Sequence, residues 1–125
     1  MKNTIRRLPD SELEVMQAVW SCASPVARID IEECLKDKHP MALTTLLTLL
    51  SRLAEKGFIQ IEKYGRSSRY IPLIGQKEYL ASQSRRFFET LCRGNVTAFA
   101  NALCDSGLSK EELAQLRCLL ERDQL

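Results

Sequence analysis

The chain has 125 residues, of which 45% are hydrophobic and 27% are charged, and its formal net charge is +2. This composition is typical of a soluble globular protein of one domain, with at most a short appendage. No apolar run approaches the roughly 18 residues of a membrane span, and the start, MKNTIRRLPD, lacks the apolar core of a signal peptide. We therefore expect a cytoplasmic protein without direct membrane insertion.

The first helix is predicted in LPDSELEVMQAVW, with Asp10 or Ser11 as the N-cap. Glu14 stands three residues after Ser11, a spacing typical of a capping box. The residues expected to form its apolar stripe are Leu13, Val15, Met16, Val19 and Trp20.

A second, shorter helix is predicted from about Val26 to Lys36. Val26, Ile29 and Leu35 are the residues expected to point inward. The segment KDKHP then ends the helix, because Pro40 disfavours helical geometry at the residue before it.

The third helix is predicted from about Ala42 to Lys56, with Gly57 as its C-terminal stop. One arc of this helix carries Leu46, Leu49, Leu50 and Leu53, and we expect it to be buried. The opposite arc carries Thr44, Thr45, Thr48, Ser51 and Arg52. A plain solvated face is the simplest interpretation, but Glu, Lys or Gln would serve such a face better. Short hydroxyl side chains let a helix approach DNA closely, so we favour that role.

A basic hairpin is predicted next, from the strands FIQIEK and SRYIPL joined by YGRSS. It carries Lys63, Arg66 and Arg69, and residues 40–75 hold five basic against two acidic side chains. Three helices followed by a basic hairpin is the order of a winged helix-turn-helix, a mostly α fold with a small β-hairpin wing. In that fold the third helix enters the major groove of double-stranded DNA and the wing contacts the backbone.

Three further amphipathic helices are predicted in GQKEYLASQSRRFFETLCRG, NVTAFANALCDSG and SKEELAQLRCLLERDQ, the last with a capping box from Ser109 to Glu112. Their main apolar residues are Leu80, Phe87, Leu91, Phe99, Leu103, Leu113, Leu116 and Leu120. These helices either pack back on the winged domain or pair with a second copy, and we favour a homodimer. The predicted organisation is a DNA-binding domain over residues 1–74 and a helical dimerisation region over residues 75–125.

The cysteines predict neither a metal site nor a disulfide scaffold, and we expect no cofactor. The five are Cys22, Cys34, Cys92, Cys104 and Cys118, widely spaced and without a CxxC motif. Most are expected to be small buried groups in a reducing compartment. A hydrolase that uses a cysteine with the single histidine, His39, is disfavoured because no glycine-framed nucleophile motif surrounds any cysteine. No catalytic residue is predicted, and we expect the protein not to be an enzyme.

Three blocks of the sequence resemble a known family in the same order and spacing. LPDSELEVMQAVW, TTLLTLLSRLAEKGFI and YIPLIGQKEYLASQSRRFFETLCRGNV are similar to successive parts of the penicillinase repressor family, the bacterial regulators of the BlaI, MecI and CopY type. The resemblance covers roughly residues 8–121. It implies a homodimeric repressor with an N-terminal winged helix on a palindromic operator. Carried over by position, it implies that Thr45, Thr48 and Arg52 face the DNA.

The resemblance also implies a route of release, and the chain departs from the family in three places. In better-known members a membrane sensor protease cleaves the C-terminal region, and the corresponding position here is Ala102–Leu103, where the residue pair differs. Leu47 replaces a basic or polar side chain of several relatives, and it either touches a thymine methyl group or packs against the protein. The end, LRCLLERDQL, lacks the paired cysteines of copper-responsive members, which disfavours copper sensing by that route.

The predicted DNA contacts therefore lie on one helix and one hairpin. They are Thr44, Thr45, Leu47, Thr48, Ser51, Arg52, Lys63, Arg66 and Arg69. Arg52 is the only candidate for a strong bidentate contact to guanine, and a pairing with Glu55 is also open, but we favour a phosphate contact for it. The alternative function is a winged-helix module that binds another protein without sequence-specific DNA binding.

Overall fold

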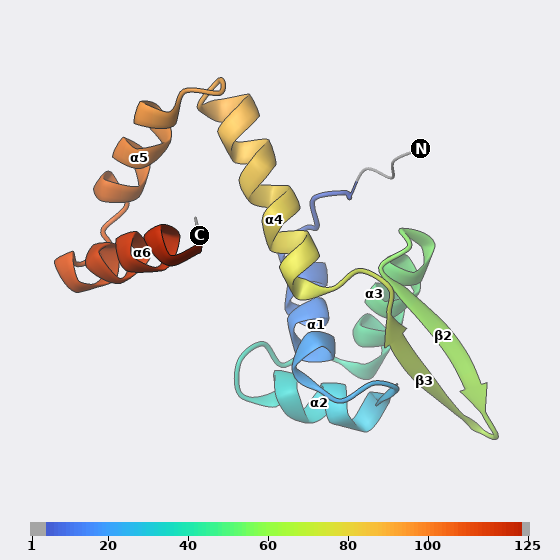
Figure 1. The fold of residues 1–125 in the computed structure, drawn as a ribbon. Coiled ribbons are helices and arrows are strands. Elements are labelled where there is room, and N and C mark those ends of the chain that lie inside the picture. The colour runs from blue at the N-terminus through green and yellow to red at the C-terminus, as the bar shows by residue number, and fades with distance from the viewer. Residues whose placement is uncertain (1–4, 124–125) are drawn as a thin grey trace. The chain divides into compact units, whose positions relative to one another are not determined.

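The structure, a computed structural model, describes residues 5–123, and its elements confirm the predicted fold class. In chain order they are α1 (Asp10–Ser21), β1 (Val26–Ala27), α2 (Arg28–Lys36), α3 (Leu43–Glu55), β2 (Ile59–Tyr64), β3 (Ser67–Pro72), α4 (Gln76–Arg86), a π-helical turn (Phe87–Leu91), α5 (Val96–Asp105) and α6 (Lys110–Asp123) (Figure 1). Two compact units divide after Gln83. The predicted functional boundary between residues 74 and 75 lies earlier, before α4, and stays a prediction.

The first unit holds a three-stranded antiparallel sheet in the order β1-β3-β2. Within it, β2 and β3 form the expected hairpin, with Ile59 opposite Pro72 and Tyr64 opposite Ser67. The predicted helical start at Val26 is wrong, because Val26 pairs with Tyr70 as part of β1. The helix begins only at Arg28.

The inward face of α2 also differs from the prediction. Ile29 is 57% exposed, whereas Ile31 is fully buried. Ile31 and Leu35 stand four residues apart, so they share the face that packs on the core, and Ile29 lies on another face.

The start of α1 does not use the predicted capping box. The helix already includes Asp10 and Ser11, its N-cap is Pro9, and no side chain caps it. The chain is fixed here by a different contact, in which the buried N–H of Leu8 donates to the Tyr79 hydroxyl at 2.9 Å. This contact ties the segment before α1 to α4.

The core of the first unit combines α1, α2, α3 and the sheet. Its buried residues are Leu8, Val15, Met16, Ala18, Val19, Val26, Ile31, Leu35, Leu46, Leu49, Leu50, Leu53, Phe58, Ile59, Tyr70 and Tyr79. Tyr79 brings the first turns of α4 into this core, because its ring lies 5.7 Å from the rings of both Trp20 and Phe58. Trp20 in turn donates from Nε1 to the Ile74 carbonyl at 2.9 Å.

The second unit is built around a small aromatic cluster. The Phe99 ring of α5 lies 5.7 Å from Phe87 and 5.5 Å from Phe88. The helix predicted to run through these phenylalanines changes to π-helical geometry at Phe87. The capping box of α6 is confirmed, since Ser109 N–H donates to Glu112 Oε1 and Glu112 N–H donates to Ser109 Oγ.

The cysteines are less buried than predicted. Only Cys92 is buried, Cys22 and Cys34 are half-buried, and Cys104 and Cys118 are exposed. The two exposed cysteines lie on the short helices α5 and α6, whose residues are mostly exposed. Over residues 5–123, no helix is long and apolar enough to cross a membrane.

An ion pair inside the first unit joins α1 to the end of α3. Glu12 is 3% exposed, yet its carboxylate accepts a hydrogen bond from Lys56 Nζ, whose side chain is 21% exposed. A buried carboxylate without its cation carries a large desolvation cost. The pair therefore favours the packing of α1 against α3 that keeps Glu12 next to Lys56.

We expect Lys56→Met to lower the free energy of unfolding by about 2–3 kcal/mol, because it leaves the Glu12 charge without its partner and the site is partly exposed. The double variant Glu12→Gln/Lys56→Met should recover part of that loss, because the remaining amide is neutral. Urea denaturation of the four chains of this double-mutant cycle measures both effects. Equal losses in the single and double variants would contradict the assignment.

Candidate nucleic-acid interface

Helix α3 has two chemically different faces. Leu46, Leu49, Leu50 and Leu53 are at most 5% exposed, as predicted. The residues of the opposite arc, Thr44, Thr45, Thr48, Ser51 and Arg52, are all exposed. Leu47 is 39% exposed and stands between the two arcs. The hydroxyl-bearing face is therefore open for contact with another molecule.

One of these hydroxyl groups is already engaged. Thr48 Oγ1 donates to the Thr44 carbonyl at 3.0 Å, within the helix. Its oxygen keeps acceptor capacity, and the residue as a whole is exposed with the rest of this face.

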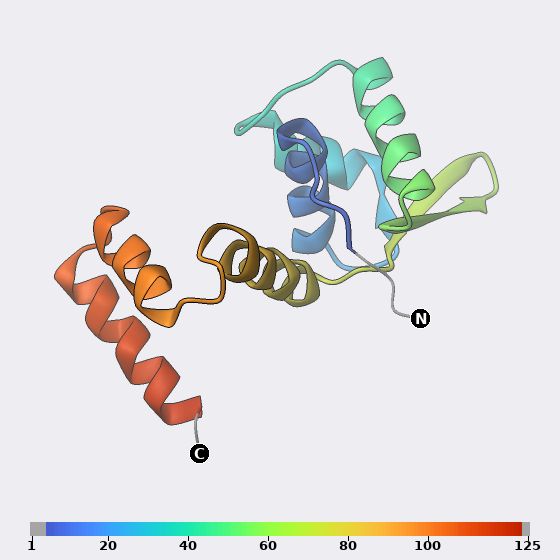
Figure 2. The ribbon, with the colours of Figure 1, turned by 90° about the horizontal axis from the view of Figure 1, so that it is seen from above.

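The end of α3 leads directly into the hairpin. Gly57 has a φ of +83°, a left-handed conformation that glycine adopts without a steric penalty. The next residue, Phe58, is fully buried, and its N–H donates to the Leu53 carbonyl at 3.0 Å. The hairpin is thus held beside α3, as Figures 1 and 2 show from two directions.

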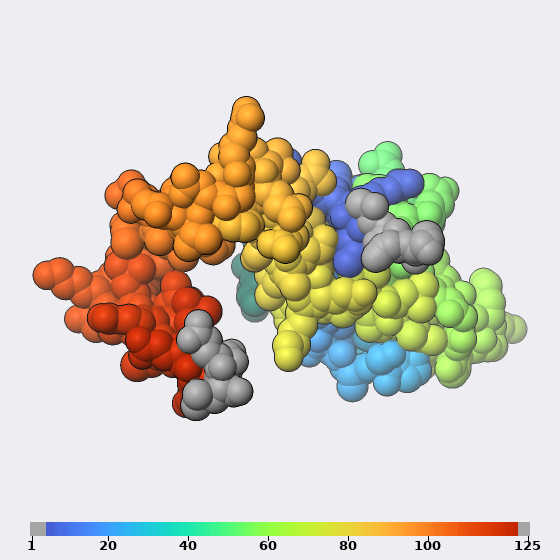
Figure 3. Space-filling view, turned by 45° about the horizontal axis from the view of Figure 1, so that its top comes forward, coloured from blue at the N-terminus to red at the C-terminus, as the bar shows by residue number. Residues whose placement is uncertain are grey.

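The tip of the hairpin is a two-residue turn. Gly65 has a φ of +65°, and Arg66 follows it between the paired residues Tyr64 and Ser67. Glycine at the first turn position is typical of a type II′ hairpin. Lys63 and Arg66 are exposed, and the hairpin projects from the first unit in the space-filling view (Figure 3, yellow-green).

Arg69 is held more firmly than the other two cations. Its guanidinium lies 5.4 Å from the centre of the Tyr64 ring and donates from Nη1 to Ser67 Oγ and the Ser68 carbonyl, both at 3.3 Å. These contacts use one nitrogen, so most of its five donors stay available. The charge of Arg69 is therefore positioned along the hairpin.

A hollow of about 350 Å³ brings part of the predicted set together with residues that the sequence did not indicate. It is lined by Ala27, Arg28, Ile29, Leu47, Arg66, Ser67, Ser68, Arg69 and Tyr70. Leu47 thus lies beside two cations of the hairpin. The other predicted contacts are exposed but do not line this hollow. They are the threonines of α3, Ser51, Arg52 and Lys63.

Arg28 and Ile29 are two of the lining residues that the sequence did not indicate as contacts. Both stand at the start of α2, and the short strand β1 brings them to the hairpin by pairing with β3. Arg28 also forms an exposed ion pair with Glu32 at 3.5 Å. The sequence signal for this pair is a basic residue followed by an isoleucine at the start of a helix. That signal can be recognised only when α2 is known to begin at Arg28.

Tyr70 lines the same hollow without adding charge. Burial raises the pKa of its hydroxyl above 10, the usual value, although the Arg28 cation and a hydrogen bond with Ser68 oppose the shift. The hydroxyl is therefore neutral at physiological pH. The charge of the hollow is set by its three arginines.

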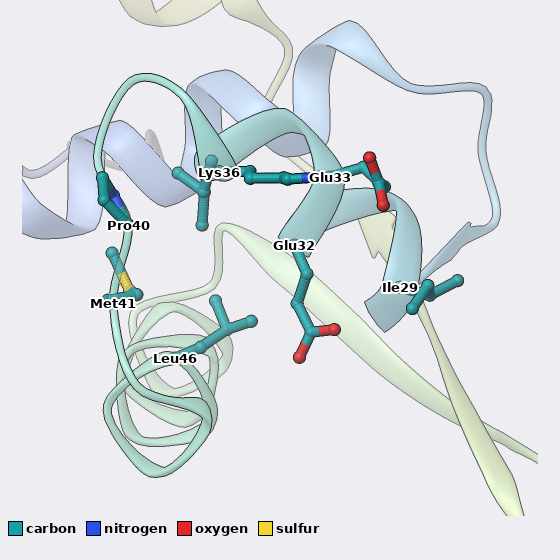
Figure 4. Close-up of a pocket in the computed structure, with 8 residues that line it drawn as sticks. Ile29, Glu32, Glu33, Lys36, Pro40, Met41 and Leu46 are labelled. Carbon is teal, nitrogen blue, oxygen red and sulfur yellow. The ribbon is translucent and has the colours of Figure 1, made fainter.

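A second hollow, of about 390 Å³, lies between α2 and the segment that precedes α3. Its floor includes Leu35, Met41 and Leu46, and Glu32 points into it from α2 (Figure 4). Glu33 and Lys36 also line it. Two carboxylates against one amine make it unsuited to a phosphate backbone, and none of the predicted DNA contacts lies in it.

The residues predicted for dimerisation differ in exposure. Leu80, Leu91 and Leu120 are 57%, 72% and 57% exposed. The others, Phe87, Phe99, Leu103, Leu113 and Leu116, are half-buried. The candidate cleavage position, Ala102–Leu103, lies inside helix α5 with both side chains half-buried. A protease would have to unwind α5 to reach that bond.

Among residues 5–123, no group of three or more His, Cys, Asp or Glu side chains is arranged to hold a metal ion. The cationic and hydroxyl side chains described above are exposed on α3 and the hairpin or line the hollow beside them. Such a constellation suits an anionic polymer, because arginines contact phosphates and short hydroxyls reach base edges.

Comparison with known proteins places this geometry in context. Residues 8–122 match the family model described as Penicillinase repressor. The penicillinase repressor of Bacillus licheniformis is 31% identical over 121 residues, which are 94% of this chain and 91% of that protein. The methicillin resistance regulatory protein MecI of Staphylococcus aureus strain N315 is 28% identical over 123 residues, 98% of this chain and 99% of the relative.

Among solved structures, the chain is similar to the monomeric form of Bacillus licheniformis BlaI, solved in solution in complex with the blaP half-operator. The TM-score is 0.50 and the sequence identity 32%, over 60% of this chain and 90% of that one.

The turn at the hairpin tip yields a direct test of its geometry. Gly65→Ala should lower the free energy of unfolding by about 1 kcal/mol, because a Cβ is disfavoured at this positive φ although open space surrounds it. Arg66→Ala, one residue away, should change it by no more than about 0.5 kcal/mol. Denaturation of both variants measures the difference, and equal effects would argue against the left-handed turn.

Proposed function

The chain belongs to the penicillinase repressor family, and from that premise we propose that it is a bacterial transcriptional repressor. It binds a palindromic operator as a homodimer, acts in the cytoplasm and is released by an inducing signal. The observation that carries the proposal is the exposed hydroxyl face of α3 beside a hairpin with three cations. The half-operator complex of the similar Bacillus licheniformis BlaI supports DNA as the partner.

In this proposal α3 lies in the major groove. The buried leucines fix the back of the helix, so the opposite arc, with Leu47 at its edge, approaches the bases. That arc carries Thr44, Thr45, Thr48, Ser51 and Arg52. These short side chains allow close approach of the helix backbone to base edges.

Arg52 supplies the one strong cationic contact on this helix. It is exposed and, in the described part of the chain, makes no ion pair with Glu55. Its guanidinium is therefore free to bind guanine in a bidentate manner or to clamp a phosphate. Leu47, which shares a hollow with Ile29 and the hairpin, is open to contact with a thymine methyl group.

The hairpin acts as the wing on the sugar-phosphate backbone. Lys63 and Arg66 reach into solvent, and Arg69 is oriented by Tyr64 and the two serines. Each neutralised phosphate releases counterions, so the affinity falls with salt at a slope of about 0.9 per contact. Arg28 extends the same charged surface from α2.

The second unit provides the dimer in this proposal. Leu91, Val96, Leu119 and Leu120 are between 41% and 72% exposed, and they are the apolar side chains that a contact between two copies would cover. Burial of these residues between two copies places two winged units on one palindrome. The linked half-sites raise affinity far above that of one unit.

Release follows from loss of the dimer. Cleavage near Ala102–Leu103 by a membrane sensor protease would divide α5. The part of the second unit that follows the cut would then be detached from the rest of the chain. The two winged units would then bind independently, and the gain from linkage would disappear. No catalytic step by the repressor itself is required.

The wing and the helix should differ in their effect on DNA binding. A duplex selected from a random library serves as the probe, with fluorescence anisotropy at several salt concentrations. Arg66→Ala should weaken binding to selected and scrambled duplexes alike and lower the salt slope by roughly one per protomer. Thr45→Ala should instead change which duplexes are preferred.

Lys77→Ala, an exposed change on α4, serves as the matched charge control and should leave binding unchanged. If both test variants bind like the parent chain, the face and wing have been misassigned. If the parent chain shows no salt-dependent affinity for any duplex, the chain is better described as a protein-interaction module.

The dimer can be tested separately from DNA. Leu120→Asp should convert a dimer into a monomer at micromolar concentration, because it places a charge in the apolar surface of the second unit. Sedimentation velocity gives the masses directly. Ile61→Asp makes the same type of change on the wing, where Ile61 is 40% exposed, and should leave the dimer intact. A parent chain that sediments as a monomer would refute the dimeric repressor.

A further inference from the structure

Two thiols meet where the end of α1 contacts α2. Cys22 Sγ lies 3.5 Å from Cys34 Sγ, within hydrogen-bonding distance, and both residues are half-buried. Ser21 Oγ lies 3.4 Å from Cys34 Sγ, and Cys22 Sγ lies 3.9 Å from the Asp30 carbonyl oxygen. The two sulfurs are therefore each other's neighbours across the joint between two helices.

We propose that Cys22 and Cys34 form a reversible thiol-modification site, which becomes an intramolecular disulfide by exchange with a small disulfide such as oxidised glutathione. The site lies within the first unit and is independent of the proposed function. A disulfide requires its sulfurs to approach to about 2.05 Å. Cys22 follows the last residue of α1 in an extended conformation, with φ of −107° and ψ of 157°, and its backbone N–H donates to the Val19 carbonyl at 3.2 Å. The remaining approach of the two sulfurs is therefore assigned to rotation of the cysteine side chains.

A small disulfide can reach Cys34 from solvent. A hollow of about 250 Å³ opens beside this residue, lined also by Glu14, Gln17, Ala18, Ser21, Leu35 and Lys38. Cys22 does not line it. Attack on the external disulfide is therefore assigned to Cys34.

The exchange balances in two steps. The Cys34 thiolate attacks one sulfur of oxidised glutathione, and the other half leaves as a glutathione thiolate that takes up a proton. Cys22 then loses its proton to solvent and attacks Cys34 Sγ, which expels the second glutathione thiolate. The two protein thiols lose two electrons and two protons, and the external disulfide is reduced to two thiols.

The environment of Cys22 makes it the second of the two thiols to react. Burial raises the pKa of the Cys22 thiol, and its hydrogen bond with Cys34 adds to the shift. The thiol is therefore protonated at neutral pH and reacts poorly with external reagents. Once Cys34 carries glutathione, the short distance to its sulfur compensates for this low reactivity.

The other cysteines offer an internal comparison. Cys92 is buried, whereas Cys104 and Cys118 are exposed on α5 and α6. An exposed thiol without a close partner stops at the mixed disulfide with glutathione. Only a thiol with a partner at contact distance proceeds to an intramolecular link.

Peptide mapping of the full chain tests the proposal. The chain, at micromolar concentration, is equilibrated with oxidised glutathione, its free thiols are alkylated, and it is digested with trypsin without reduction. The expected product joins the peptide Leu8–Arg28 to the peptide Ile29–Lys36. This link should exceed any link to Cys104 or Cys118 by at least about tenfold, because it is intramolecular. Oxidation should raise the melting temperature by about 5–10 °C, and dithiothreitol should reverse it.

A Cys104→Ser/Cys118→Ser variant keeps the pair and should give the same linked peptide, whereas Cys34→Ser should abolish the link and the thermal shift. Glutathione adducts on Cys22 or Cys34 without the link would overturn the proposal. Reaction with glutathione at Cys104 and Cys118 alone would also overturn it. Both results are obtained on the parent chain, so neither depends on the stability of a variant.

Discussion

The burial of four leucines on one side of α3 determines how the first unit presents itself to other molecules. Leu46, Leu49, Leu50 and Leu53 lie in the core, where α3 packs on α1 and β2. Each buried leucine contributes about 1.5–3 kcal/mol, so a rotation of the helix about its axis would cost most of the stability of a small domain. The threonine-bearing arc is therefore held outward by the core, and the chemistry of that arc is free to serve recognition.

The same core also positions the wing. Phe58 follows directly after the left-handed turn at Gly57, and its ring is fully buried. Its carbonyl accepts hydrogen bonds from Leu73 and Ile74 at 2.7 Å and 3.4 Å, so both ends of the hairpin meet at one buried residue. The cations of the wing are thus attached to α3 through a buried, hydrogen-bonded base. In the proposed repressor, groove reading and phosphate binding are geometrically linked for this reason.

Local patterns predicted those parts of the molecule that depend on neighbouring residues. The two arcs of α3, the hairpin with its glycine turn and the capping box at Ser109 all follow from spacing within a few positions. The missed features depend on partners far along the chain. β1 exists because β3 pairs with it, Glu12 is buried because Lys56 meets it, and Cys22 faces Cys34 because two helices cross. No periodicity contains that information. The position of Arg28 at the candidate interface was missed because it depends on β1.

The orientation of α3 toward DNA can be measured most directly by intermolecular nuclear Overhauser effects. The full chain, labelled on threonine methyl groups, would be bound to a selected duplex. If α3 lies in the major groove, the methyl groups of Thr44, Thr45 and Thr48 should give contacts to base protons there. If the duplex is bound but all of its contacts come from other parts of the chain and none from these threonines, the proposed orientation of α3 is contradicted.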